Sequence, residues 1–408
     1  MLFDGDSREN ALTALSIMRV AGLFLCLLLG AAPAVAEAPA MELASDTAAH
    51  WVSFDLTPGN QIRFTMTVNG RPATAVLDTG VTHSLISRRF AEAIGLRPML
   101  AGQADAIGGT VPLGWATVES LAIGGLTRTG GRLAVADLKA IATGSAEPVE
   151  MLIGSDLLGS QALDIDYDGR RFRLLPSGRL PFTGTSVPLS IAPDSGVFLS
   201  ELSIGRHRFK PVIVDTGDGS SVTLSREMWG AARVPTPPLT SAYAFGLGGA
   251  IETDLTVLPA VRLAGLTARN VEVRIEGKDG FSQLTGTAGR IGSGLLQRYR
   301  VLIDPTARRM VFAPGKTVDR EPLKSTSGLL IALQGRSLRV LHVMRNSPAA
   351  AAGWHAGERI CAIDGTPIPA DYLATPLAAW PAGAPGRTVR LGLCDNGGDR
   401  TLTLARFY

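Results

Sequence analysis

Residues 73–87 read ATAVLDTGVTHSLIS: an apolar run, an acid, a Thr-Gly turn, and then a second apolar start. The run predicts a buried strand that ends at Asp78, and Gly80 follows two residues later. A buried carboxylate costs free energy unless another group pairs with it. The partner of Asp78 must therefore come from elsewhere in the chain.

An internal repeat supplies that partner. Residues 63–96 and 197–234 each contain a strand, a Gly turn, a second apolar strand that ends in Asp-Thr-Gly, and a short helical stretch. The match continues downstream with a near-constant offset, because Asp215 follows Asp78 by 137 residues and Gly292 follows Gly154 by 138. We expect two homologous lobes, at residues 51–181 and 182–317.

The composition favours a β-rich globular protein with many turns. Hydrophobic residues make up 46% of the 408 residues and charged residues 18%, with 47 Gly and 25 Pro. Short apolar strands separated by turn residues predict mainly antiparallel β lobes. Helical patterns are few, and the clearer ones are residues 86–96 and 225–232.

Two Asp-Thr-Gly copies at equivalent places predict an active site. A pseudo-two-fold axis between the lobes would bring Asp78 and Asp215 together, and two such carboxyl groups share one proton. One can act as a base toward water while the other donates to a substrate carbonyl. The glycines allow close approach, and the threonine hydroxyls can hydrogen-bond across the axis. The residues expected to support this dyad are Thr79, Gly80, Thr216 and Gly217.

A single Asp-Thr-Gly is weak evidence, since Asp and Gly also favour ordinary turns. A duplicated β domain that carries these residues only as turn chemistry is the alternative. Two copies inside a matched repeat favour the dyad.

The segment VLDTGVTHSLIS resembles the active-site loop of the retropepsin-like aspartic proteases, and the duplication is similar to the two-lobed pepsins. Both families close the loop with a later apolar-apolar-Gly segment, and residues 152–154 and 290–292 occupy that place, the second with Arg290 in an apolar slot. The resemblance covers residues 51–315. It implies an aspartic endopeptidase that needs no cofactor, whose dyad is known to share a proton.

The resemblance also implies a β-hairpin flap over the cleft in each lobe. The paired glycines of residues 107–110 and 247–250 suit mobile hairpin tips. The first flap lacks the tyrosine that pepsins carry there. The flap candidates are Gly108, Gly109, Gly248 and Gly249.

The residues after each Asp-Thr-Gly depart from the pepsin pattern, in which a hydroxyl often follows. Here they are Val81 and Asp218. Val81 cannot hydrogen-bond to an ionised dyad, and a charged Asp218 would oppose ionisation, so we expect activity that extends toward neutral pH. An Asp218 that points outward as a turn acid is the alternative.

Other chemistries find little support. Residues 164–169 (DIDYDG) open like a calcium loop, but Leu175 stands where its twelfth position needs an acid, so a strand, turn and strand is the preferred interpretation. The five histidines give no zinc ligand set, and no metal is expected. The net charge of +3, without a basic stripe, argues against nucleic acid.

Residues 318–408 have a different character and resemble a PDZ domain through the order SPAxxAG…GExIxxIDG. The resemblance implies that the loop at residues 327–330 binds a peptide C-terminus, with Gly328, Leu329 and Leu330 as the binding residues. A module that only packs against the lobes is the alternative. Cys361 and Cys394 also lie here, either as one disulfide or as two free thiols.

The N-terminus has the features of a secretory signal peptide. Arg19 precedes an apolar stretch, and Ala34-Val35-Ala36 forms an A-x-A cleavage site. We expect translation to start at Met18, a signal peptide that ends at residue 36, and a linker at residues 37–50. The protein would be exported to the periplasm or the extracellular space, or be membrane-associated if the segment is retained as an anchor.

The preferred function is therefore an exported, monomeric aspartic endopeptidase that hydrolyses polypeptides with Asp78 and Asp215. Its PDZ-like domain would recruit substrate or regulate cleavage by binding peptide C-termini or exposed hydrophobic segments. The alternative is a catalytically silent peptide-binding protein with the same fold.

Overall fold

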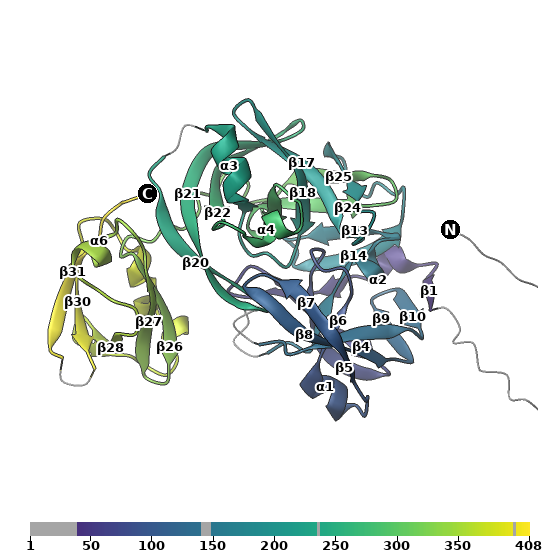
Figure 1. The fold of residues 1–408 in the computed structure, drawn as a ribbon, viewed down its shortest axis with the longest axis horizontal. Coiled ribbons are helices and arrows are strands. Elements are labelled where there is room, and N and C mark those ends of the chain that lie inside the picture. The colour runs from purple at the N-terminus through teal and green to yellow at the C-terminus, as the bar shows by residue number, and fades with distance from the viewer. Residues whose placement is uncertain (1–38, 140–147, 235–236, 395–396) are drawn as a thin grey trace, which may run out of the picture. The chain divides into compact units, whose positions relative to one another are not determined.

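A computed structural model describes residues 39–139, 148–234, 237–394 and 397–408. These residues are mainly β-strand, as the sequence predicts, and Figure 1 shows their strands and helices. The predicted signal peptide lies outside the described residues, together with the first residues of the predicted linker. No helix in the described part of the chain is long and apolar enough to span a membrane.

An 11-stranded sheet, the N-terminal sheet, carries Asp78. Its order is β1-β10-β9-β4-β5-β12-β6-β11-β8-β7, with β3 paired to β4. Residues 40–43, expected in a linker, instead form β1 and pair with β10. The strands are β1 Ala40–Leu43, β3 Asp55–Leu56, β4 Ile62–Val68, β5 Arg71–Leu77, β6 Leu85–Ser87, β7 Met99–Ala106, β8 Gly109–Thr117, β9 Ser120–Ile123, β10 Leu126–Thr129, β11 Arg132–Ala136 and β12 Met151–Ile153.

An 8-stranded sheet, the central sheet, carries Asp215. Its order β17-β18-β23-β19-β22-β21-β20, with β16 beside β17, repeats the order β4-β5-β12-β6-β11-β8-β7 of the N-terminal sheet. The sequence repeat is therefore also a repeat of topology. The strands are β16 Ser190–Ile191, β17 Phe198–Ile204, β18 His207–Asp215, β19 Val222–Leu224, β20 Thr240–Gly246, β21 Gly249–Leu263, β22 Leu266–Ile275 and β23 Gly289–Gly292.

A third, six-stranded sheet joins the two repeats (Figure 1), in the order β15-β25-β24-β13-β14-β2. Strand β13 pairs with β24 although the paired residues are far apart in the chain, for example Ile165 with Val301. The strand, turn and strand interpretation of residues 164–169 is confirmed by β13 and β14. The strands are β2 Val52–Ser53, β13 Gln161–Asp166, β14 Arg171–Pro176, β15 Thr185–Pro188, β24 Tyr299–Asp304 and β25 Arg309–Pro314.

The helices are short, and the two predicted ones are confirmed. Ser87 caps α1 (Arg88–Ala93) by accepting from the Phe90 N–H, and Ser225 caps α3 (Arg226–Ala232) in the same way. The other helices are α2 Ser155–Leu158, α4 Phe281–Leu284, α5 Ser293–Leu296, α6 Pro348–Ala351, and the 3-10 turns η1 Thr47–Ala49, η2 Tyr372–Ala374 and η3 Pro376–Ala382.

The C-terminal sheet has its own hydrophobic core, which includes Trp354, Tyr372 and Trp380. Its order is β26-β27-β28-β30-β31, with β29 paired to β28. Its strands are β26 Leu329–Gln334, β27 Ser337–Val343, β28 Arg359–Ile363, β29 Thr366–Pro367, β30 Thr388–Leu393 and β31 Asp399–Thr403.

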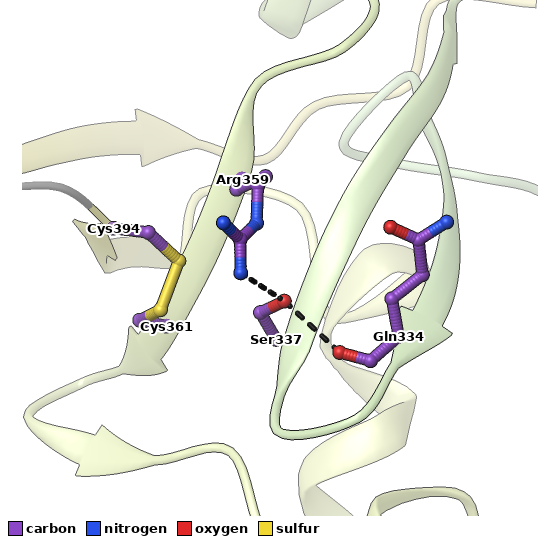
Figure 2. The surroundings of a disulfide bond; sticks show 5 residues. All are labelled: Gln334, Ser337, Arg359, Cys361 and Cys394. Carbon is purple, nitrogen blue, oxygen red and sulfur yellow. Dashed lines mark hydrogen bonds between the residues drawn. A yellow bond between two sulfur atoms is a disulfide. The ribbon is translucent and has the colours of Figure 1, made fainter.

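Of the two states left open for the cysteines, the structure shows the disulfide. Cys361 on β28 is bonded to Cys394 just after β30 (Figure 2). Beside it, Arg359 donates to the Ser337 hydroxyl, which donates in turn to the Gln334 carbonyl. The bond therefore joins β28 to the residue that follows β30, and the two cysteines are 33 residues apart in the chain.

Candidate active site

Asp78 lies directly after β5, at the end of the buried residues Val76 and Leu77. Strand β12 runs parallel to β5 and pairs Ile153 with Leu77, and the Asp78 N–H donates to the Ile153 carbonyl at 2.9 Å. Strand β12 thus pairs with the last three residues of β5, from Ala75 to Leu77, so the loop that follows starts from a fixed point.

Asp215 occupies the equivalent place as the last residue of β18. The parallel neighbour is now β23, which pairs Asp215 with Gly292. The two segments that the sequence analysis matched to each other, residues 152–154 and 290–292, thus support the two aspartates in the same manner.

The two Asp-Thr-Gly loops are bound to each other by their threonines. The Thr79 N–H donates to the Thr216 hydroxyl, and the Thr216 N–H donates to the Thr79 hydroxyl, both at 3.0 Å. Each hydroxyl then donates to a carbonyl of the opposite strand, Thr79 to Val214 at 2.6 Å and Thr216 to Leu77 at 2.8 Å. Four reciprocal hydrogen bonds, all buried, fix the loops relative to one another.

The glycines of the two loops face the opposite carboxyl groups. A Cβ at Gly80 would lie 2.4 Å from the Asp215 Cγ, and a Cβ at Gly217 would lie 2.3 Å from the Asp78 Cγ. No side chain fits in either place. The structure therefore brings together all six residues that the sequence predicts for the dyad and its supporting loops.

The environment of the dyad favours its protonated form. Burial and the neighbouring Asp215 carboxyl hold the pKa of Asp78 well above its usual range, and the two carboxyl groups share a hydrogen bond. Burial, followed by the charge of Asp218, raises the pKa of Asp215 to about 6, against the opposing effect of Arg290. Such a pair titrates as a unit, and it can hold one proton at near-neutral pH.

Asp218 does not point outward, which decides between the two alternatives for this residue. Its carboxylate is partly buried and accepts from the Arg290 Nε at 3.0 Å, from the Ser220 hydroxyl at 2.7 Å, and from the Thr223 hydroxyl at 3.1 Å. Burial acts to raise the pKa of Asp218, but Arg290 and the hydrogen bonds from Ser220 outweigh it and lower that pKa. A fixed negative charge therefore lies beside the dyad.

Two supporting residues were not found by sequence reasoning. The Gln61 side-chain amide donates to the Gly217 carbonyl at 2.7 Å, and the Ser293 hydroxyl donates to the Thr216 carbonyl at 2.7 Å. Both therefore fix the backbone of the second Asp-Thr-Gly loop through its carbonyl groups. Nothing in their local sequence marks them, since each acts through a carbonyl that is far away in the chain.

The flap candidates lie at the tips of two hairpins, β7–β8 and β20–β21, which meet. The Gly248 N–H donates to the Ile107 carbonyl at 3.0 Å. A Cβ at Gly108 would lie 2.5 Å from the Gly249 carbonyl oxygen, and one at Gly248 would lie 2.4 Å from the Gly109 nitrogen. The paired glycines thus allow the backbones of the tips to touch.

Apolar side chains extend this contact between the hairpins and the first loop. Leu247, at the tip of the second hairpin, packs with Val81, Leu113 and Trp115 against one small hydrophobic cluster. His83 makes an edge contact with Trp115, with ring centroids 5.2 Å apart.

The loop predicted to bind a peptide C-terminus already uses two of its N–H groups. The Gly328 N–H donates to the Ser325 hydroxyl at 2.9 Å, and the Leu329 N–H donates to the Ser327 hydroxyl at 3.1 Å. Leu330 lies in β26 and pairs with His342 of β27. A carboxylate that enters this loop must displace both hydroxyls.

The described residues contain no group of three His, Cys, Asp or Glu side chains that could hold a metal ion. Asp164 and Asp166, which open the calcium-like motif, are ion-paired instead. Asp164 is fully buried between Arg173 and Arg300, at 3.0 and 2.9 Å, and Asp166 pairs with Arg171 at 3.1 Å.

Comparison with known proteins agrees with this geometry over part of the chain. Residues 64–157 match the family model of aspartyl proteases, a range that includes Asp78, the first hairpin and residues 152–154. This match supports an aspartyl protease domain and, with it, a general protease function. A search of curated proteins found no match.

Proposed function

We propose that the protein is an aspartic endopeptidase whose catalytic residues are Asp78 and Asp215. The observation that carries the proposal is the pair of carboxyl groups, each facing a glycine of the other loop and locked by the reciprocal threonine hydrogen bonds. The family match covers only the first of the two loops. The topological repeat supports extending the assignment to the second, so that two lobes in one chain form the site.

The chemistry follows from one shared proton. The ionised carboxylate removes a proton from a water molecule, whose oxygen attacks the peptide carbonyl carbon, while the protonated carboxyl donates its proton to the carbonyl oxygen. In the tetrahedral intermediate the C–N bond then breaks. The amine leaves with the proton taken from water, and one hydroxyl returns its proton to the other aspartate, which restores the starting state.

The hairpin tips support a cleft that opens to admit an extended peptide. Their contact is made by one backbone hydrogen bond and by glycines without side chains, so opening breaks few interactions. Gly108, Gly109, Gly248 and Gly249 would then serve as flap residues.

Export is proposed from the sequence of the N-terminus and is supported by the disulfide. Disulfides persist in the periplasm and outside the cell and are rare in the cytosol. Nucleic acid is not a proposed partner, and a monomer suffices because one chain supplies both aspartates.

The C-terminal sheet is proposed to be a PDZ-like module that regulates the cleft or recruits substrate. It contacts the β20–β21 hairpin directly: the Thr240 hydroxyl donates to the Arg345 carbonyl at 2.7 Å, and the Arg345 N–H donates to the Ser241 hydroxyl at 3.0 Å. His342 stacks on Tyr243, with centroids 4.3 Å apart. A peptide bound at β26 would therefore lie one strand away from a residue that touches the flap hairpin.

The test is proteolysis of a denatured-protein mixture by the wild type, Asp78→Asn and Asp215→Asn. Asn has the size of Asp and keeps an acceptor for the loop N–H groups. Cleavage by the wild type that is lost in both variants supports the proposal. A folded wild type that binds peptides and cuts none at any pH would instead be the catalytically silent binder.

A further inference from the structure

The surroundings of the two aspartates differ although their backbones match. In the N-terminal sheet the residues beside the loop are Val81 and Leu152, both part of one hydrophobic cluster. In the central sheet the equivalent residues are Asp218 and the buried Arg290, which form an ion pair with 3.0 Å between Nε and Oδ2. The pairing registers establish the equivalence, since Leu152 lies opposite Val76 and Arg290 opposite Ile213.

Arg290 is the centre of this difference. Its side chain is buried, and its Nη1 donates to the Glu276 carboxylate at 2.8 Å and to the Ser282 hydroxyl at 3.1 Å. Its Nε also lies 3.8 Å from the Asp215 carboxylate. A buried guanidinium needs such partners, and here one of the partners is a member of the dyad.

Asp215 also accepts more backbone hydrogen bonds than Asp78 does. One Asp215 oxygen accepts from two N–H groups, those of Gly217 and Asp218, each at 2.9 Å. The Asp78 carboxyl accepts one loop N–H, that of Gly80 at 3.1 Å. Hydrogen bonds donated to a carboxylate favour its charged form. Asp215 therefore has two N–H donors and a nearby cation, which the Asp218 carboxylate opposes, where Asp78 has one donor and an apolar wall.

We infer that Arg290, held by Asp218 and Glu276, makes the dyad asymmetric: Asp215 keeps the negative charge and takes the proton from water, and Asp78 keeps the shared proton and donates it to the carbonyl oxygen. Arg290 is a positioning residue, because it acts through Asp215. The inference rests on the proposed function for its catalytic meaning, but the charge assignment itself is testable without any substrate.

The experiment is a ¹³C NMR titration of protein labelled at the aspartate Cγ. Asp78→Asn leaves Asp215 as the remaining dyad member, and Asp215→Asn leaves Asp78. Each signal is identified by its absence from the Asp78→Asn/Asp215→Asn double variant. We expect Asp215 to titrate at a lower pH than Asp78, with protonation constants that differ by about tenfold or more. Equal or reversed midpoints would overturn the inference.

Two further substitutions on the Asp78→Asn background separate charge from structure. Asp218→Asn removes a negative neighbour and should move the Asp215 midpoint to lower pH, whereas Arg290→Gln removes the positive neighbour and should move it to higher pH. Arg290→Lys keeps the charge and should restore the midpoint. A merely structural role predicts no such opposite shifts, and shifts in one common direction would contradict the inference.

The matched control is Asp137→Asn, which breaks the exposed ion pair of Asp137 with Arg88 and should leave the Asp215 midpoint unchanged. If Arg290→Gln does not fold, the order of the two midpoints and the direction of the Asp218→Asn shift still decide the outcome. Proteolysis is measured on the same samples. A protein that keeps the predicted order and cuts nothing refutes the proposed function alone, and an active protein with the reverse order refutes the inference alone.

Discussion

At the scale of single residues, the site depends on two places where a side chain is excluded. The Asp78 and Asp215 carboxyl groups occupy the space in which Cβ atoms of Gly217 and Gly80 would lie. The threonine hydrogen bonds hold the two loops at a fixed separation. At that separation there is room for the carboxyl groups only because residues 80 and 217 have no side chain.

Gly80→Ala should therefore reduce kcat/KM by about 100-fold or more, since a shift of the reacting groups by about 1 Å has that effect. Its Cβ would lie 2.4 Å from the Asp215 Cγ, and the carboxyl must move. Steady-state kinetics on a fluorogenic peptide measure the loss. The control is Gly230→Ala in α3, where a Cβ meets no atom within 4 Å and activity should be unchanged. Equal activity of both variants would contradict this role of Gly80.

The raised pKa values of the dyad predict how activity depends on pH. As the inferred base, Asp215 must be ionised, and its pKa is about 6, while Asp78 must be protonated, and burial and the Asp215 charge hold its pKa well above its usual range. The rate should thus rise from pH 4 to about pH 6 and be highest near neutrality. A pH–rate profile of kcat/KM measures this, and a maximum below pH 4 would contradict it.

The same pKa shift makes a prediction about stability. The pKa of Asp78 is higher in the folded than in the unfolded chain. Its contribution to the free energy of unfolding is therefore most favourable below the unfolded-state pKa of 3.8 and is lost as pH rises toward the folded-state pKa. Asp78→Asn does not titrate. Its thermal midpoint should exceed that of the wild type by a margin that grows from pH 4 to pH 7, as thermal unfolding will measure. A margin that shrinks over this range would refute the burial argument.

The sequence predicts the aspartates, threonines and glycines because each carries its own local signal twice. It does not predict that Asp218 and Arg290 pair, because 72 residues separate them in the chain. Each is a charged residue at a position where the related families carry an uncharged one. The pair exists because β18 and β23 run in parallel and place Arg290 opposite Ile213. A buried arginine in an apolar slot was the available signal, since such a charge requires a carboxylate partner.

At the scale of elements, the hairpins β7–β8 and β20–β21 form the boundary of the site. The resemblance implies two hairpins, and their paired glycines suit mobile tips. That the tips of the two hairpins bond to each other, Gly248 to Ile107, depends on the separation of the two sheets and could not be predicted from either repeat alone.

Gly248→Ala should separate these tips, because its Cβ would lie 2.4 Å from the Gly109 nitrogen. We expect kcat/KM to fall about tenfold, mainly through a higher KM, since the dyad itself is untouched. Kinetics beside the same Gly230→Ala control measure the effect. A fall in kcat with KM unchanged would show that the tips do more than hold the substrate.

The shared sheet is the element that the sequence leaves undetected. Strands β13 and β24 occupy equivalent places in the two repeats, so their similarity is visible, but their pairing with each other is not. The repeat predicts what each unit contains. It does not specify which equivalent strands become neighbours across the axis.

The disulfide should stabilise the C-terminal sheet and leave the dyad unaffected. Replacing Cys361 and Cys394 by Ala should lower the free energy of unfolding of this part by about 4 kcal/mol, as expected for a loop of this length. Denaturation followed by Trp fluorescence measures it, with Trp354 and Trp380 in that core. Loss of peptide cleavage in the folded variant would contradict the independence of the two parts.

At the scale of the whole molecule, three sheets carry the repeats, and a fourth, C-terminal sheet has a separate proposed role. The first three position the aspartates and the hairpins, and the fourth touches the second hairpin through Thr240, Ser241 and Tyr243. The sequence predicts a separate C-terminal module from its change in character. Its contact with the hairpin could not be predicted, since the residues involved are ordinary surface types.

In the proposed function, Asp78 and Asp215 together hydrolyse peptide bonds. The most direct measurement is digestion of a denatured-protein mixture from pH 3 to pH 8 by the wild type, Asp78→Asn and Asp215→Asn, with products identified by mass spectrometry. We expect cleavage by the wild type, blocked by a hydroxyl-bearing mimic of the tetrahedral intermediate, and none by either variant. Cleavage that survives in either folded variant would contradict it.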